Sequence, residues 1–471
     1  MKQAKNIIVA GVGPIPIGNP DKVYAPGIRL LAFSRYIHKA GYNVITAEAA
    51  FKNEKSSLSS IKVIEKGWER TGIPLDSQRA ADKISALIYE RKPIAVVSTT
   101  DVMNKASGSI RTDIPRWMDF FGHPMVERQE ISYIHSCDLG LLDQWRFIVP
   151  ALLTGDHFSV CSIPQKHALI GELGATGRLN QFTSGHDLVS VIPPGLPDHE
   201  PRNNGETAFR GEAVPKDAFC ILWNGGFNTW VDENTLFKGI VYAMKRSEKI
   251  HFVMTGGAIK GHNEITFSRF RKKVKDCPYS GRFHFFGWVP LNKLPAFYTE
   301  ADVAINIDRF TYEGILGCRN RVFSWIKFGI PVITTSLSEN TKDLVSRNLA
   351  VGFPIGNASQ LGEKLIGIMN NPSRYKDLAE KAKTYVSDRY GYETVLKPLI
   401  RWLESPGIAP DRQKEKLRDF VIEGGRILSV PDNALSLLHA RKLSDEICEL
   451  KLKSAPTSRI SRWIKKLKTL L

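Results

Sequence analysis

Long hydrophobic runs, clustered cysteines and metal-ligand patterns are all missing from this sequence. No stretch of eighteen or more residues is apolar, which excludes a membrane-spanning helix. The cysteines are few and scattered: Cys137, Cys161, Cys220, Cys277, Cys318 and Cys448. Their spacing matches neither a metal site nor the disulfide framework of a small secreted protein. These absences favour a protein of the reducing cytoplasm, without disulfides and without a bound metal.

The unusual bulk property that is present is positive charge. The 471 residues include 65 Lys and Arg against 48 Asp and Glu, a formal net charge of +17. A basic surface attracts polyanions such as nucleic acid, anionic lipid or phosphate-bearing substrates. Because no nucleic-acid-binding motif occurs, we expect no nucleic-acid partner. The chain is 42% hydrophobic and long enough for two or three domains.

Two regions alternate β-branched apolar runs with segments of helical period, which is typical of parallel sheets with crossover helices. The first region begins with the strand-like NIIVAGV (6–12) and the helix-like GIRLLAFSRYIHKAG (27–41). A polar, Gly- and Asn-rich stretch (197–217) then interrupts the pattern, and the alternation restarts at FCILWNGG (219–226). Two such halves imply a cleft at the carboxyl ends of their strands, where ligands of doubly wound sheets bind. After about residue 405 the sequence is charged and helical in period.

Five stretches, in order and spacing, resemble glycosyltransferase family 4, the retaining enzymes of GT-B architecture. They are APGIRLLAFSRYIHKAGYNVITA, DHFSVCSIPQKHALIGELGATGRLN with VIPPGLP, WNGGFNTWVDENTLFKGI, FFGWVPLNKLPAFYTEADVAINI and EGILGCRNRVFSWIKFGIPVITT. The resemblance covers roughly residues 1–400. It implies an α/β fold of two Rossmann-like domains facing a cleft, plus a helical C-terminal extension.

The resemblance also divides the chain. The expected units are an acceptor-binding domain (1–198), a linker (199–217), a nucleotide-sugar-binding domain (218–388), a helix packing back on the body (389–405), a helical extension (406–457) and a basic amphipathic helix (458–471).

The family's acidic motif falls at Glu313, followed here by Arg319 and Arg321. The resemblance implies that Glu313 accepts hydrogen bonds from hydroxyls of the donor sugar. A leaving nucleoside diphosphate develops negative charge, which guanidinium groups can neutralise without a metal. Many family members place an Arg and a Lys after the first strand of the second domain, but this chain has only the distant Lys238 there. It resembles a bacterial subgroup with Glu then Arg-x-Arg, so we expect the two arginines to take over that duty.

A second departure lies at Ser324, where the family usually has an acidic residue for the ribose hydroxyls. A serine can bond one hydroxyl but cannot hold two as a carboxylate does. Donor affinity is therefore in question. The glycines expected to let a ligand approach the strand ends closely are Gly225, Gly226, Gly256 and Gly257.

Three residues of the first domain complete the candidate site. His123 is the best candidate for the histidine that related enzymes place near the donor sugar, with a structural histidine as the alternative. Gly27 and Arg29 begin the helix facing the acceptor cleft, and Arg29 is expected either to meet a donor phosphate or anionic acceptor, or to be a helix-start arginine with a surface partner.

The chain ends in a basic amphipathic stretch, SRISRWIKKLKTLL. Its apolar face carries Trp463 and its basic face includes Lys465 and Lys466, which predicts contact with an anionic membrane surface. The alternative is docking on the protein's own body or on a partner subunit.

The function expected from these observations is a retaining, metal-independent glycosyltransferase without cofactor. It would use a nucleotide-sugar as co-substrate and a glycan or lipid-linked acceptor, in bacterial surface polysaccharide or lipopolysaccharide synthesis. The expected location is the cytoplasm, at the inner face of the membrane. A nucleotide-sugar epimerase and a non-catalytic scaffold of the same architecture remain as alternatives.

Overall fold

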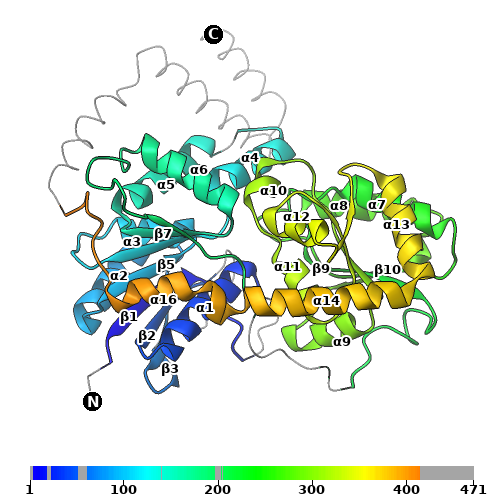
Figure 1. Cartoon of the computed structure of the whole chain (residues 1–471), viewed down its shortest axis with the longest axis horizontal. Helices are drawn as coiled ribbons and strands as arrows, with labels where there is room; N and C mark the ends of the chain where they lie inside the picture. Colours follow the sequence, from blue (N-terminus) through cyan, green and yellow to red (C-terminus); the bar gives the residue numbers. More distant parts are fainter. Residues whose placement is uncertain are drawn as a thin grey trace, which may run out of the picture.

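Two twisted sheets, each covered by helices, form the body of the protein (Figure 1). The computed structural model describes residues 4–18, 23–50, 61–138, 140–196, 203 and 205–413. The first sheet has the strand order β3-β4-β2-β1-β5-β6-β7-β8 and the second β11-β10-β9-β12-β13-β14. All neighbouring strands are parallel except β3 and β4. The predicted α/β class is confirmed.

The first domain contains β1 to β8 and α1 to α6. Its strands are β1 (Asn6–Val12), β2 (Asn43–Ala49), β3 (Lys62–Glu65), β4 (Trp68–Ile73), β5 (Ala95–Thr99), β6 (Arg116–Phe120), β7 (His157–Val160) and β8 (Val189–Val191). Its helices are α1 (Ala25–Lys39), α2 (Ser77–Arg91), α3 (Asp101–Gly108), α4 (Pro124–His135), α5 (Leu141–Thr154) and α6 (Ile163–Ala175). The central strands read as continuous apolar runs because helices cover both faces of a parallel sheet.

The second domain repeats this plan around a shorter sheet. Its strands are β9 (Phe219–Gly226), β10 (Ile250–Gly257), β11 (Phe283–Gly287), β12 (Val303–Asn306), β13 (Val332–Thr335) and β14 (Val351–Phe353). Its helices are α7 (Glu233–Met244), α8 (Ile265–Lys275), α9 (Leu294–Thr299), α10 (Tyr312–Leu316), α11 (Asn320–Lys327), α12 (Glu339–Ser346), α13 (Ala358–Asn370) and α14 (Pro372–Tyr390). Polar caps begin several helices; at α7, for example, the Asp232 carboxylate accepts from the Thr235 amide.

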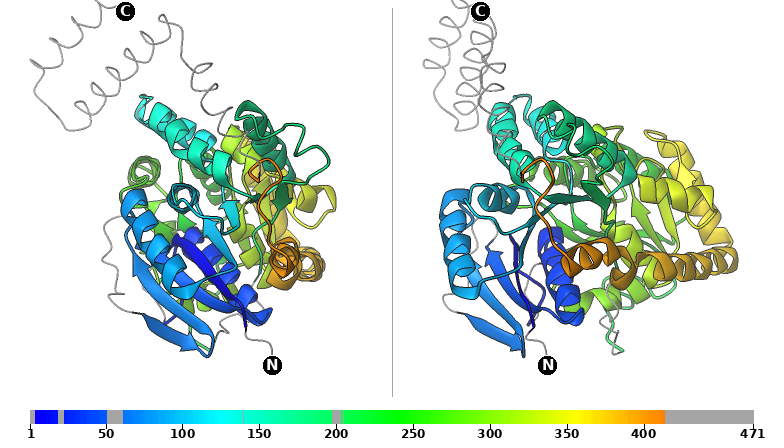
Figure 2. Two further views of the ribbon diagram at one scale, coloured as in Figure 1. Left: turned by 90° about the vertical axis from the view of Figure 1, so that its left-hand side faces the viewer. Right: turned by 60° about the vertical axis from the view of Figure 1, so that its left-hand side comes forward.

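The chain returns to the first domain after α14. Helices α15 (Tyr392–Val395) and α16 (Lys397–Glu404) follow α14 along one side of both domains (Figures 1 and 2). Leu399 and Leu403 of α16 are fully buried in the core that also contains Ile7 of β1. Leu196, which follows β8, forms a short parallel backbone bridge with Gly391, which lies between α14 and α15.

The described part of the predicted linker (199–217) is in contact with the second domain. Phe209 is fully buried against the rings of Phe286 and Phe297. The Glu300 carboxylate accepts hydrogen bonds from the backbone amides of residues 208–210. The described part of this segment therefore packs onto the second domain.

Beyond α16, residues 406–413 form a strap without helix that lies on the first domain. Asp411 forms a buried ion pair with Arg178, and Asp156 accepts from the Ala409 amide. The rest of the predicted extension and the basic amphipathic stretch, with Trp463, Lys465 and Lys466, lie outside the described residues. Within the described ranges, no helix combines the length and apolarity that a membrane crossing requires.

The cysteines depart in one respect from the expectation. Cys161, Cys220, Cys277 and Cys318 are free thiols. Cys137 is disulfide-bonded, although the scattered spacing predicted no disulfide.

Candidate functional site

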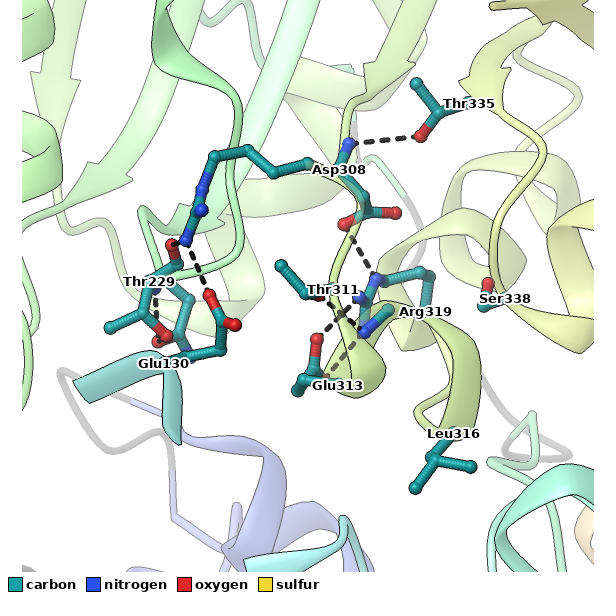
Figure 3. Close-up of polar contacts among 12 residues, drawn as sticks. Glu130, Thr229, Asp308, Thr311, Glu313, Leu316, Arg319, Thr335 and Ser338 are labelled. Carbon is teal, nitrogen blue, oxygen red and sulfur yellow. Dashed lines mark hydrogen bonds and ion pairs between the residues drawn. The ribbon is translucent and has the colours of Figure 1, made fainter. Parts of the chain in front are cut away.

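A buried ion-pair cluster follows the carboxyl end of β12. Asp308 comes two residues after this strand, Glu313 lies in the first turn of α10, and Arg319 precedes α11. Arg319 donates from Nε to Asp308 at 2.9 Å, and from Nη1 and Nη2 to the two oxygens of Glu313 at 3.0 and 2.7 Å. Figure 3 shows the guanidinium of Arg319 between the two carboxylates. All three side chains are almost completely buried.

The charges of this cluster hold one another in place. Burial raises the pKa of Glu313, and the attraction of Arg319 works against that rise. Burial also disfavours the charged form of Arg319, but the carboxylates of Asp308 and Glu313 outweigh it and raise the pKa of Arg319. The bidentate contact of Arg319 fixes the direction of the Glu313 carboxyl group.

Three of the guanidinium N–H groups of Arg319 bind Asp308 and Glu313, so the arginine orients the Glu313 carboxylate. Its expected role toward a leaving diphosphate stays a prediction. The neighbouring Asp308, which the sequence analysis missed, completes the cluster; its position two residues after an apolar strand was the available signal.

Arg321, in contrast, has donor capacity to spare. Its Nη2 donates to the Gly226 carbonyl oxygen at 3.0 Å, and its guanidinium carbon lies 4.6 Å from the centroid of the Trp223 ring. Its buried Nη1 has no hydrogen-bond partner among the residues that the structure describes. Burial lowers the pKa of Arg321 to about 10, so the group remains cationic at neutral pH. A partly buried cation with an unused donor is suited to receive an anion.

Arg321 meets the glycines predicted at the strand ends. Gly225 has φ +91° and open space where a side chain would point. At Gly256, φ is +85° and a Cβ atom would lie 2.3 Å from the Gly225 carbonyl oxygen, so only glycine fits between β9 and β10. Gly226 and Gly257 end the same two strands. Gly225 therefore leaves open space at this edge of the sheet, and the predicted approach of a ligand to the glycine backbone stays a prediction.

The first domain contributes a second set of charges from α4. Glu130 pairs with Arg309 of the second domain at 2.5 Å, and Arg309 also donates to the Thr229 carbonyl oxygen at 2.8 Å (Figure 3). A second contact between the domains joins the Ser162 hydroxyl to the Leu316 carbonyl oxygen. The sequence analysis missed these residues because their partners are distant along the chain.

Glu127 lies on α4, one turn before Glu130. Its pKa is raised to about 8, first by burial and then by the negative charges of Glu313 and Asp101, while Arg319 and Arg128 act in the opposite direction. Glu127 is therefore largely protonated at neutral pH and can donate a hydrogen bond where an ordinary glutamate cannot.

We predict that Glu127→Gln flattens the pH dependence of stability. The folded chain holds this proton up to about pH 8, whereas the unfolded chain releases it near the ordinary value of 4.5. The contribution of Glu127 to stability is therefore full below pH 4.5 and is lost as the pH rises from there to about 8. Between about pH 5 and 8.5, the melting temperature of the wild type should fall relative to that of the variant, so the difference between the two widens as the pH rises.

The exposed Glu248 offers a matched control, since Glu248→Gln should run parallel to the wild type. Parallel curves for Glu127→Gln would contradict the raised pKa.

His123 lies at the start of α4, where its Nε2 is 3.3 Å from a Glu172 carboxylate oxygen. Burial lowers the pKa of His123 to about 4, so the ring is neutral, and burial raises that of Glu172 to about 7. A role of His123 beside a donor sugar stays a prediction. Ser324 is half-buried on α11, and its expected contact with a ribose also stays a prediction.

Arg29 is only 2% exposed, and it donates to both carboxylate oxygens of Asp119 at 3.0 and 2.7 Å and to the carbonyls of Ile192 and Pro193. The alternative of a surface partner is wrong, because Asp119 is buried. The expected contact of Arg29 with a donor phosphate or an anionic acceptor stays a prediction. Gly27 has a packing role: a Cβ there would lie 2.1 Å from the Pro14 carbonyl oxygen.

The described part of the chain brings no three His, Cys, Asp or Glu side chains together in the manner of a metal site. Residues 218–371 match the family model for glycosyl transferases group 1. This part of the chain is therefore similar to that family. The cluster around Glu313, Arg321 and the strand-end glycines all lie within the matched residues.

Solved structures extend the similarity over both domains. Sucrose-phosphate synthase from Thermosynechococcus elongatus superimposes with a TM-score of 0.65 at 14% identity, covering 85% of this chain and 99% of that one. An α,α-trehalose-phosphate synthase from Burkholderia xenovorans gives 0.62 at 11%, covering 85% and 100%. Anabaena HepE, in complex with UDP and glucose, gives 0.58 at 12%, covering 85% and 100%. The fold that these proteins share with this chain is GT-B, as predicted. No curated protein sequence matches the chain.

Proposed function

We propose that this protein is a retaining, metal-independent glycosyltransferase that moves a sugar from a nucleotide-diphosphate sugar to a glycan or lipid-linked acceptor. The observation that carries the proposal is the partly buried guanidinium of Arg321, whose Nη1 has no partner among the described residues and whose Nη2 binds the Gly226 carbonyl oxygen, together with the Glu313 carboxylate held by Arg319 in the same domain. A diphosphate and a sugar are the adjoining chemical groups that this pair would bind.

Each group of the site has a defined task in this proposal. The Glu313 carboxylate accepts hydrogen bonds from donor-sugar hydroxyls, while Arg319 keeps it oriented. Arg321 stabilises the negative charge that develops on the β-phosphate. The acceptor oxygen bonds to the anomeric carbon from the face that the diphosphate leaves. The bond from that carbon to the phosphate oxygen breaks, and a donor phosphate oxygen takes the acceptor proton. No enzymic nucleophile is needed.

The donor domain is the second one, and the acceptor enters from the first. Interdomain contacts such as Glu130 with Arg309 help close the site and exclude water, which would otherwise hydrolyse the donor. Family 4 and its subgroup with Arg-x-Arg are the assignment that we favour.

The acceptor class and location are the less constrained part of the proposal. The charge of +17 suits a phosphate-bearing or membrane-associated acceptor, as in bacterial surface polysaccharide or lipopolysaccharide synthesis. Peripheral attachment through residues 458–471 would place the enzyme at the inner membrane face. Deleting residues 455–471 should then lower sedimentation of the protein with anionic vesicles. If vesicle binding and transferase activity both stay unchanged, the proposed membrane attachment is wrong.

Nucleotide binding gives the first test. Among UDP, GDP, TDP, ADP and CMP with EDTA present, one class should raise the melting temperature; a ligand at about 100 times its Kd adds about 2.7 kcal/mol to stability. UDP is the first candidate because HepE was crystallised with it. NMR of the product should show that the transferred sugar keeps the anomeric configuration it had in the donor, as a retaining enzyme requires.

Two other outcomes would favour the alternatives. No shift at millimolar nucleotide would indicate that Ser324 has disabled donor binding and would favour a non-catalytic scaffold. An epimerised free sugar formed without acceptor would indicate an epimerase.

A further inference from the structure

Three large aromatic side chains are exposed around the ion pair that joins the domains. Tyr133 is 64% exposed on α4, Phe310 is 71% exposed on the segment leading into α10, and Tyr312 is 61% exposed at the first residue of α10. We call these residues the aromatic lip. Tyr89, another exposed aromatic residue, belongs to α2, which carries neither residue of this ion pair.

The arrangement of the aromatic lip follows from its charged neighbours. The guanidinium carbon of Arg309 lies 4.6 Å from the centroid of the Tyr133 ring, while the same group binds Glu130. Phe310 is the next residue in the chain, and helix α10 packs against α4. Tyr312 directly precedes Glu313, the proposed sugar-binding carboxylate. Both domains therefore contribute rings beside the reaction centre.

We propose that the aromatic lip is the subsite for the sugar rings of a saccharide acceptor, an inference that rests on the proposed function. An aromatic face carries partial negative charge, and the apolar C–H face of a pyranose packs on it. Tyrosine adds a hydroxyl at the ring edge, and Glu130 and Arg309 supply polar partners nearby. A lipid chain would need a continuous aliphatic surface, whereas here charged groups separate the rings.

One consequence is that binding of the acceptor is coupled to closure of the two domains on each other. Because Tyr133 belongs to the first domain and Phe310 and Tyr312 to the second, a saccharide lying across the lip contacts both. Acceptor binding then favours the arrangement in which Glu130 reaches Arg309.

The test is binding of the full-length protein to an immobilised panel of oligosaccharides, in the presence of the nucleotide identified above. The variants Tyr133→Ala, Phe310→Ala and Tyr312→Ala should each weaken binding at least tenfold, while Tyr312→Trp should retain it because the stacking face is kept. Tyr89→Ala is the matched control, since it removes an aromatic that is 85% exposed at another site. The nucleotide-induced rise in melting temperature should be the same in all variants.

The outcomes separate the two proposals. If no nucleotide stabilises the wild type, the proposed function fails. If nucleotides bind but the lip variants hold saccharides as the wild type does, or if no saccharide binds, the aromatic lip is not an acceptor subsite. If the alanine variants instead lose sedimentation with phosphatidylglycerol vesicles and keep saccharide binding, the lip contacts lipid and the inference is overturned.

Discussion

Replacing Arg321 by alanine is expected to lower kcat/KM for sugar transfer by about 10²- to 10³-fold, corresponding to about 3–4 kcal/mol of transition-state stabilisation. The physical reason is that the leaving diphosphate gains charge, and Arg321 is the cation held at the strand-end glycines with an unused donor. The nucleotide-induced rise in melting temperature should fall in parallel. Initial rates and thermal shifts of the two proteins measure both effects.

Controls separate charge from packing in this experiment. Arg321→Lys keeps the charge but loses the planar fork, so it should recover part of the rate. Arg269→Ala removes an exposed arginine from α8 of the same domain and should leave both readouts unchanged. Wild-type nucleotide binding in Arg321→Ala would show that the diphosphate lies elsewhere.

Replacing Asp411 by alanine is expected to cost about 3–5 kcal/mol of stability, because it leaves a buried arginine without its counter-ion. Arg178 is fully buried; its Nε and Nη2 donate to Asp411 at 2.6 and 3.1 Å, and Nη1 donates to carbonyl oxygens of the first domain. Removing the carboxylate leaves Arg178 buried with only neutral carbonyl acceptors among the hydrogen-bond partners named above. Urea or thermal unfolding followed by tryptophan fluorescence should show an earlier transition.

The matched control for this change is Glu206→Ala, which removes a half-exposed ion pair with Lys293 and should cost no more than about 1 kcal/mol. The double variant Arg178→Met with Asp411→Leu should recover much of the loss, because it removes the isolated charge as well. An unchanged transition for Asp411→Ala would show that the strap contributes little to the fold.

The site illustrates how far sequence patterns reach. The positions of Glu313, Arg321 and the strand-end glycines could be predicted because each lies within a few residues of an apolar strand or helix, and strand ends of one parallel sheet meet at one edge. The carboxylates that bind Arg319 and Arg29 could not be predicted. Whether an arginine faces a ligand or an internal carboxylate depends on which acidic residue the fold brings to it.

By itself, the sequence determined the alternation of strands and helices, the two α/β halves and the resemblance that predicted GT-B, because hydrophobic period and turn residues act over short distances. Only the tertiary structure decided the charge pairing. Arg29 with Asp119, Glu130 with Arg309 and Arg178 with Asp411 join residues separated by 90, 179 and 233 positions. Such pairs leave no local pattern, since each forms only when burial makes an unpaired charge too costly to tolerate.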